Sequence, residues 1–156
     1  MILYLIAVGS KCTQWAETGF QDYQKRLPAE CKLNLIKIPL SKRSKNSEIS
    51  KHIVEEEKRM LAAIPKRSRI IALDVQGQML NTQQLAKTLQ QWQLDRQDVS
   101  LLIGGPDGLG ETCINKAERI WSLSPLTLPH ALVRIVVAEQ LYRAWSLLNN
   151  HPYHRE

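Results

Sequence analysis

This sequence has few cysteines, and none of them belongs to a recognisable cysteine motif. The three residues, Cys12, Cys31 and Cys113, are widely spaced and odd in number, and no two stand at CxxC spacing. That pattern excludes a disulfide framework and a zinc knuckle as the basis of the fold. We expect buried free thiols in a reducing compartment.

Long apolar runs, repeats and linkers are lacking as well. The apolar stretch at residues 1–8 is too short to cross a membrane and has no basic segment before it. The longest later stretch is interrupted by Arg134, Glu139 and Arg143. We therefore expect one domain over residues 1–156, cytoplasmic and without membrane contact.

Positively charged side chains outnumber negatively charged ones. Lys and Arg number 21 against 15 Asp and Glu, a formal net charge of +6. A basic excess of this size favours polyanionic partners through long-range steering. Many proteins without a nucleic-acid role are equally basic, so charge alone leaves both possibilities open.

Apolar periodicity alternates between strand and helix. The ranges that read as strands are 2–8, 33–38, 70–73, 99–103 and 120–124. Helical patterns begin near residues 12, 47 and 82, then occupy 111–119 and the stretch from about 131. Such alternation is typical of an α/β fold, a mostly parallel sheet with helices on both faces.

Details of these elements are predicted too. Ser47 and Thr82 are expected to cap the second and third helices. The apolar face of the second helix is expected to hold Ile49, Ile53 and Met60, together with Leu61 and Ile64. A turn at Gly77 is expected to close the third strand. The four tryptophans are expected in the core rather than as base-stacking platforms: Trp15, Trp92, Trp121 and Trp145.

A ligand site is expected where the strands end. In open α/β sheets, ligands bind beyond the carboxyl ends of the strands. Three segments meet this description, namely those that follow Leu73, Ile103 and Leu123.

The glycine-rich loop 104–110 is the richest of the three. Gly105, Gly110 and Thr112 fall at P-loop spacing, but Glu111 stands where a phosphate-binding Lys is required. The glycines do not form GxGxxG either. A ligand without phosphates, held by backbone groups, fits better, and S-adenosylmethionine is such a ligand. The alternative is that the loop is only a tight connection.

Several motifs together resemble a known family. The most specific are SLLIGGPDG at 100–108, LTLPH at 126–130 with Arg134, and NHPYHR at 150–155. Lys42-Arg43, and Leu73-Asp74 with Gly77, agree with them. The chain resembles the SPOUT superfamily of RNA methyltransferases and, more narrowly, its ribosomal RNA large subunit methyltransferase H family, although Asp107 stands where Glu is more usual.

This resemblance implies a fold, a reaction and a partner. It implies a C-terminal trefoil knot and a homodimer packed through the knotted region. It also implies methyl transfer from S-adenosyl-L-methionine, without a metal, to N3 of a pseudouridine in 23S ribosomal RNA, on assembled ribosomes. The implied donor-binding residues are Leu73, Gly104, Leu123, Ser124, Pro125, Leu126, Thr127 and Leu128.

The chain's C-terminal tail carries side chains suited to the methylation of a ring nitrogen. Tyr153 is suited to stacking on a base, and Arg155 to gripping a phosphate or a base carbonyl. His154 is the candidate for accepting the proton, because a histidine ordinarily titrates near neutrality. In a dimer the tail is expected to complete the partner's site. The competing interpretations are a frayed terminus and, less favoured, a metal pair with His151.

Two further assignments complete the sequence-based expectations. The basic loop residues Lys42, Arg43 and Lys45 are expected to contact RNA, the alternative being a solvated loop. His130 is expected to have a structural role. The competing functions are a non-enzymatic RNA-binding module and a different α/β enzyme acting on a small molecule.

Overall fold

The computed structural model describes residues 1–9 and 11–155, which build a single five-stranded sheet. The strand order is β2-β1-β4-β3-β5, and neighbouring strands are parallel. The strands are β1 (Ile2–Val8), β2 (Lys32–Ile38), β3 (Arg69–Met79), β4 (Val99–Ile103) and β5 (Arg119–Ser122). The predicted α/β class and parallel sheet are confirmed.

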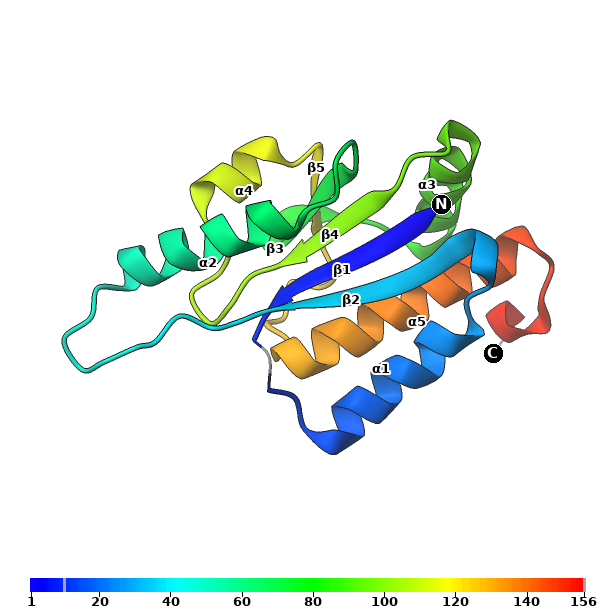
Figure 1. The fold of residues 1–156 in the computed structure, drawn as a ribbon. Coiled ribbons are helices and arrows are strands. Elements are labelled where there is room, and N and C mark those ends of the chain that lie inside the picture. Colours follow the sequence, from blue (N-terminus) through cyan, green and yellow to red (C-terminus); the bar gives the residue numbers. More distant parts are fainter. Residues whose placement is uncertain (10, 156) are drawn as a thin grey trace.

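Helices cover both faces of this sheet. The five are α1 (Gln14–Arg26), α2 (Ile49–Ala63), α3 (Thr82–Asp95), α4 (Glu111–Lys116) and α5 (His130–Leu148). Helix α5 packs between α1 and α3 on one face, while α2 and α4 lie on the other (Figure 1). Two 3₁₀ turns, η1 (Ala29–Cys31) and η2 (Pro152–Arg155), complete the described chain. None of its helices is long and apolar enough to cross a membrane.

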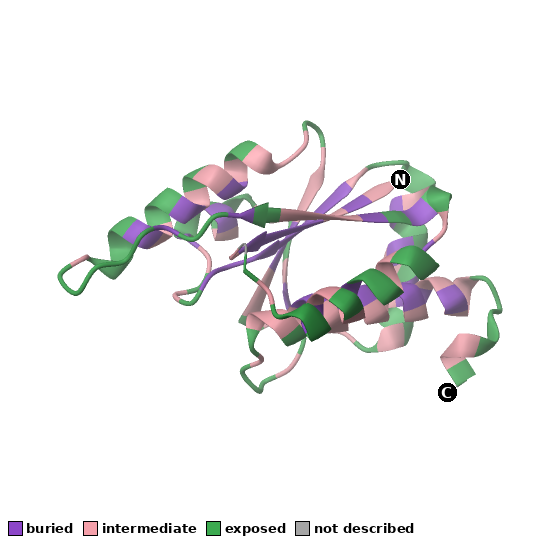
Figure 2. Ribbon diagram, turned by 60° about the horizontal axis from the view of Figure 1, so that its bottom comes forward, coloured by how far each residue is buried: buried purple, intermediate pink, exposed green. Residues whose placement is uncertain are grey.

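The core is divided by the sheet into two clusters, and strand β1 contributes to both. Leu3 and Leu5 point into the larger cluster with α1, α3 and α5, whereas Ile6 and Val8 point into the smaller one with α2. Figure 2 shows the buried central strands between partly exposed helices. A strand covered on both faces must be apolar throughout, which explains the uninterrupted run in the sequence.

Strand β3 is longer than predicted. It continues through Asp74 and Gly77 to Met79, with a register shift against β5 between Leu73 and Gln78. Gly77 is not a turn that ends the strand but a close approach, since a Cβ there would stand 2.7 Å from the carbonyl oxygen of Ile120. The predicted end at residue 73 was therefore wrong because the strand crosses an irregularity and resumes.

Neither predicted helix cap was correct. The residue before α2 is Glu48, and Ser47 bonds instead to the backbone of Ser44. Asn81 caps α3 in a reciprocal capping box with Gln84, which makes Thr82 the first helical residue.

Some residues predicted to be buried are exposed. The inward face of α2 carries His52, Glu56 and Met60, while Ile49 is 60% exposed. Trp15 is 57% exposed, unlike the buried Trp92 and Trp121. In α2, polar side chains occupy positions on the protein-facing side, so apolarity alone misplaces its buried face.

The three cysteines are free thiols. Cys31 and Cys113 are buried, whereas Cys12 is only half-buried. Burial raises the pKa of Cys31 to about 11 and that of Cys113 to about 12. The two buried thiols are therefore protonated and unreactive at neutral pH.

Candidate active site

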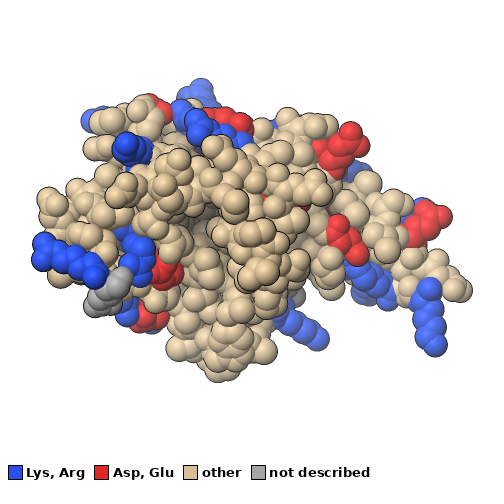
Figure 3. Space-filling model, turned by 180° about the vertical axis from the view of Figure 1, so that it is seen from behind, with Lys and Arg blue, Asp and Glu red and all other residues tan. Residues whose placement is uncertain are grey.

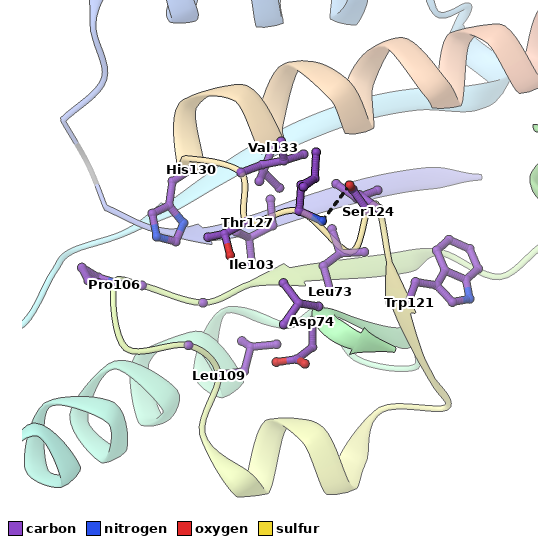
Figure 4. Close-up of a pocket in the computed structure, with 17 residues that line it drawn as sticks. Leu73, Asp74, Ile103, Pro106, Leu109, Trp121, Ser124, Thr127, His130 and Val133 are labelled. Carbon is purple, nitrogen blue, oxygen red and sulfur yellow. Dashed lines mark hydrogen bonds between the residues drawn. The ribbon is translucent and has the colours of Figure 1, made fainter. Parts of the chain in front are cut away.

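A cavity of about 300 Å³ opens at the carboxyl edge of the sheet, where β4 and β5 end and where the pairing of β3 with β4 stops at Leu73. Its walls come from the three segments predicted from strand ends and from the beginning of α5 (Figure 4). The lining residues are Leu73, Asp74, Val75, Ile103, Gly104, Gly105, Pro106, Gly108, Leu109, Trp121, Leu123, Ser124, Leu126, Thr127, Leu128, His130 and Val133.

The glycine loop turns back on itself beside this cavity. A Cβ on Gly104 would lie 2.4 Å from the carbonyl carbon of Gly108, so no larger residue fits there without moving backbone. The Gly108 amide donates to the carbonyl of Gly105 at 3.0 Å, and Gly108 has φ +85°. The fold thus requires glycine at positions 104 and 108. The absence of side chains leaves the backbone groups of this loop accessible to a ligand in the cavity.

The loop after β5 is fixed by its serines. The Ser122 hydroxyl donates to the Ser124 carbonyl at 3.0 Å, and the Leu126 amide donates to the Ser124 hydroxyl at 3.0 Å. The second of these bonds is drawn in Figure 4. This local turn holds the segment as one wall of the cavity.

Seven of the eight residues expected to contact the donor line this one cavity. They are Leu73, Gly104, Leu123, Ser124, Leu126, Thr127 and Leu128; Pro125 is not among the lining residues. The structure therefore brings together three segments that are far apart in sequence, and their contact with a donor remains a prediction.

His130 is the titratable ring of the cavity, although the sequence suggested only a structural role. Burial, and secondarily the Arg134 guanidinium, lower the pKa of His130. Its Nδ1 atom is buried without a hydrogen-bond partner. His130 is therefore a neutral imidazole that faces the cavity at neutral pH.

Asp74 is another polar residue that the sequence did not place in the site. It lies on a different wall from His130 (Figure 4), and its Oδ1 accepts from the Gln76 amide at 2.9 Å. Its position directly after Leu73 was the signal that could have indicated it, because the strand-end rule applies equally to the next residue.

The C-terminal tail is packed against the protein. The Tyr153 hydroxyl donates to Glu139 at 3.0 Å and lies 3.3 Å from the Tyr23 hydroxyl, and the Tyr153 ring lies 4.7 Å from that of Tyr142. Burial and these hydrogen bonds raise the pKa of Tyr153. The hypothesis of a frayed terminus therefore does not hold for Tyr153.

This tail lies far from the cavity of its own chain. The cavity includes the first turn of α5, and the tail follows its last turn (Figure 1). Helix α5 has 19 residues and is therefore about 28 Å long. The structure does not bring Tyr153, His154 or Arg155 to the cavity of the same chain.

The basic loop separates into two kinds of residue. Lys42 and Lys45 are exposed, and no ion pair with another described residue is found for either. Arg43 instead pairs with Glu56 at 2.9 Å and with Asp107 at 2.6 Å. The structure thus leaves the two lysines available for a partner and commits Arg43 within the fold.

One face of the molecule carries little charge. Figure 3 shows a wide, hollowed area without Lys, Arg, Asp or Glu, with charged side chains at its edges. Exposed apolar side chains stand on the cavity rim and on the first turn of α5, namely Val75, Leu123, Leu126 and Leu132. Within residues 1–9 and 11–155, no three His, Cys, Asp or Glu side chains gather as a metal site.

Comparison with known families decides what kind of enzyme has this cavity. The family model described as "Predicted SPOUT methyltransferase" matches residues 1–154. The chain belongs to the SPOUT methyltransferase family. SPOUT methyltransferases generally use S-adenosylmethionine as the methyl donor.

Solved structures share the SPOUT fold at low sequence identity. A probable methylase family protein from Haemophilus influenzae Rd KW20 has a TM-score of 0.59 and 9% identity, over 96% of this chain and 69% of that one. TrmJ from Z. mobilis ZM4 has a TM-score of 0.55 and 15% identity, over 92% of this chain and 68% of that one. At these identities the likeness concerns the fold.

Proposed function

We propose that this SPOUT methyltransferase methylates N3 of a pseudouridine in 23S ribosomal RNA, on assembled ribosomes in the cytoplasm. The observation that carries the proposal is the cavity, in which the three segments expected to bind S-adenosylmethionine form one surface. The net charge of +6 supports a polyanionic substrate.

The chemistry of the cavity fits this donor. Among the described residues, neither Lys nor Arg lines the cavity, and Asp74 is the carboxylate found there. A triphosphate would meet no cation there, whereas a sulfonium ligand is compatible with a carboxylate and with backbone carbonyls. The volume lies at the lower end of the range for small-molecule sites. Gly104 and residues 123–128 would hold the donor, which supplies an electrophilic methyl group.

The reaction also needs a group that accepts the N3 proton and a group that binds the nucleotide. We assign proton transfer from N3 to His154, while Arg155 holds a phosphate or stabilises charge on a base carbonyl. Tyr153 is engaged by Glu139 and Tyr23, so within this scheme it anchors the tail. The distance between tail and cavity supports a homodimer in which each tail completes the partner's site. A trefoil knot in the C-terminal part belongs to the same proposal.

The uncharged face supports the position of the dimer contact. The exposed apolar side chains on the cavity rim and on the first turn of α5 would be covered by a second copy. A contact related by two-fold symmetry repeats the same patch on both chains. If the two copies of α5 packed antiparallel across the two-fold axis, the start of one helix would lie close to the tail of the other chain.

Methyl transfer tests the function directly. Ribosomes that lack the modification are incubated with the protein and with S-adenosylmethionine labelled in its methyl group, and naked large-subunit RNA is treated in parallel. Label on 23S RNA in ribosomes, at N3 of a pseudouridine, is the expected result. If the protein binds the donor but labels neither substrate, the methylation proposal is wrong, and a non-catalytic RNA-binding role gains support.

Mixed dimers test the shared site. One chain carries His154→Ala and the other Thr127→Arg, which places a cation on the exposed cavity rim. Either variant alone should be inactive, but dimers from equal coexpression should recover about a quarter of wild-type activity, because half are mixed and each has one intact site. Recovery absent from isolated mixed dimers would show that tail and cavity act within one chain.

Ribosome binding tests the exposed lysines. Lys42→Glu with Lys45→Glu should weaken binding and lower the slope of log affinity against log salt by about 2 units, the value for two lost phosphate contacts. Unchanged affinity and slope would remove this loop from the RNA interface.

A further inference from the structure

A buried carboxylate on α2 organises the segment that connects β2 to α2. Glu56 is 2% exposed, and its Oε1 accepts hydrogen bonds from the Ser41 amide at 3.0 Å and the Ser41 hydroxyl at 3.1 Å. The same oxygen accepts from Arg43 at 2.9 Å. The basic loop is therefore tied down at Ser41 and Arg43, beside the exposed lysines.

Arg43 also reaches the glycine loop. Its second terminal nitrogen donates to Asp107 Oδ2 at 2.6 Å, across 64 positions in sequence. One guanidinium thus joins a carboxylate of α2 to a carboxylate of the loop after β4. Arg can make both contacts at once because its planar guanidinium has donors on two separate terminal nitrogens, whereas the three donors of Lys share one nitrogen.

Asp107 stands where it can position the donor loop without entering the cavity. Its neighbours Pro106 and Gly108 both line the cavity, whereas Asp107 is not a lining residue. The other oxygen of Glu56 also lies against this loop, 2.9 Å from where a Cβ of Gly105 would stand. The glycine loop therefore lies against Glu56 and is bonded from outside by Arg43.

We propose that Arg43 is a positioning residue for donor binding rather than an RNA contact. The inference rests on the proposed function, because it takes S-adenosylmethionine as the ligand of the cavity. By fixing Asp107, Arg43 keeps the backbone of the glycine loop in the conformation that receives the donor. Loss of the Arg43–Asp107 pair leaves the loop to be ordered when the donor binds, and the affinity falls accordingly.

Calorimetric titration with S-adenosylmethionine and with S-adenosylhomocysteine tests this inference. Arg43→Gln and Asp107→Asn should each raise the Kd about tenfold, which corresponds to about 1.4 kcal/mol. The double variant should be little worse than either single one, because both remove the same pair. Arg43→Lys should recover part of the loss, since it restores one of the two contacts.

Arg59→Gln is the matched control. Arg59 also pairs with a glutamate of α2, Glu55, and donates to the Pro39 carbonyl at 2.9 Å, so it holds the same connecting segment. No contact between Arg59 and the glycine loop is found in the described chain. Arg59→Gln should lower the melting temperature at most slightly and leave the donor Kd unchanged.

Methyl transfer to ribosomes provides a second readout. The Arg43→Gln enzyme should show a raised KM for the donor and a kcat close to wild type at saturating donor. Equal donor affinity in wild type and Arg43→Gln, or equal weakening by Arg43→Gln and Arg59→Gln, would overturn the inference. Failure of the wild type to bind either ligand would instead overturn the proposed function.

Discussion

Two residues one turn apart on α5 show how the protein sets the state of a group in its cavity. Arg134 is 4% exposed, and its guanidinium donates to the carbonyls of Val8 and Gly9 rather than to a carboxylate. An uncompensated cation in this position disfavours a second positive charge on His130. Arg134 therefore anchors the end of β1, while burial of His130, with Arg134 as the smaller cause, lowers its pKa and keeps the imidazole neutral.

The lowered pKa of His130 predicts that the stability of the folded protein depends on pH. Because the folded pKa is lowered, the unfolded chain binds the proton more readily, and stability falls as the pH drops below about 6.5, the ordinary value for histidine. His130→Gln should reduce the loss of melting temperature between about pH 7.5 and pH 5.5 by a few degrees. Identical pH profiles for wild type and variant would contradict this assignment.

Gly104 gives a second prediction at this scale. Gly104→Ala forces a Cβ against the Gly108 backbone, so it should cost about 1–3 kcal/mol of stability and weaken donor binding more than about tenfold. Gly19→Ala is the control, because its Cβ would meet only the flexible end of Ile135, at 3.1 Å. Urea unfolding and donor titration measure both effects, and normal donor binding by Gly104→Ala would show that the loop does not shape the site.

Sequence reasoning was most accurate for residues next to strand ends. Leu73, Gly104 and Leu123 were placed correctly at one cavity, because a parallel sheet brings all its carboxyl ends to one edge. It could not find the contact between Arg43 and Asp107, since pairing between side chains distant in sequence leaves no periodic signal. For the same reason it grouped Arg43 with Lys42 and Lys45, although Arg43 is engaged by Glu56 and Asp107.

At the scale of elements, α3 and α4 show two ways to provide hydrogen-bond acceptors for the free backbone amides at a helix start. Asn81 and Gln84 cap α3 from its own sequence. Helix α4 begins after Gly110 without a local side-chain cap, and Glu57 of α2 accepts from the Cys113 amide at 2.8 Å instead. The first arrangement is visible in sequence as a motif, whereas the second depends on the packing of α2.

The two caps predict different consequences. Asn81→Ala and Glu57→Ala should each lower the free energy of unfolding by about 1 kcal/mol. Only Glu57→Ala should also weaken donor binding, by about threefold, a loss below 1 kcal/mol, because α4 follows the glycine loop directly. Equal donor affinity in the two variants would show that the start of α4 has no influence on the site.

At the scale of the whole molecule, topology was predictable and assembly was not. Five alternating units sufficed to indicate a parallel sheet, since each crossover must return its strand to the same direction. Whether the uncharged face meets a second copy depends on surface complementarity, which a single chain's pattern does not encode. The knot and the dimer rest on family membership for the same reason.

The dimer proposal predicts the effect of a charge on α5. Leu132, on its first turn, is 38% exposed and belongs to the apolar surface near the cavity. Leu132→Glu should raise the dimer dissociation constant at least about tenfold, since a buried unpaired carboxylate is costly. Leu94→Glu is the control. Leu94 lies in the last turn of α3, at the end of the sheet where β4 begins, and is 71% exposed. Light scattering over a dilution series reports the masses, and equal dissociation of both variants would refute this contact surface.

Helix α5 carries a cavity wall at one end and the C-terminal tail at the other. Inserting a single residue in it would advance the tail by about 1.5 Å and swing it by about 100°. If each tail serves the partner, that shift would be imposed on both sites at once. In that arrangement the loop that carries Lys42 and Lys45 would tolerate a change of length, whereas α5 would not, because its length sets the distance between cavity and tail.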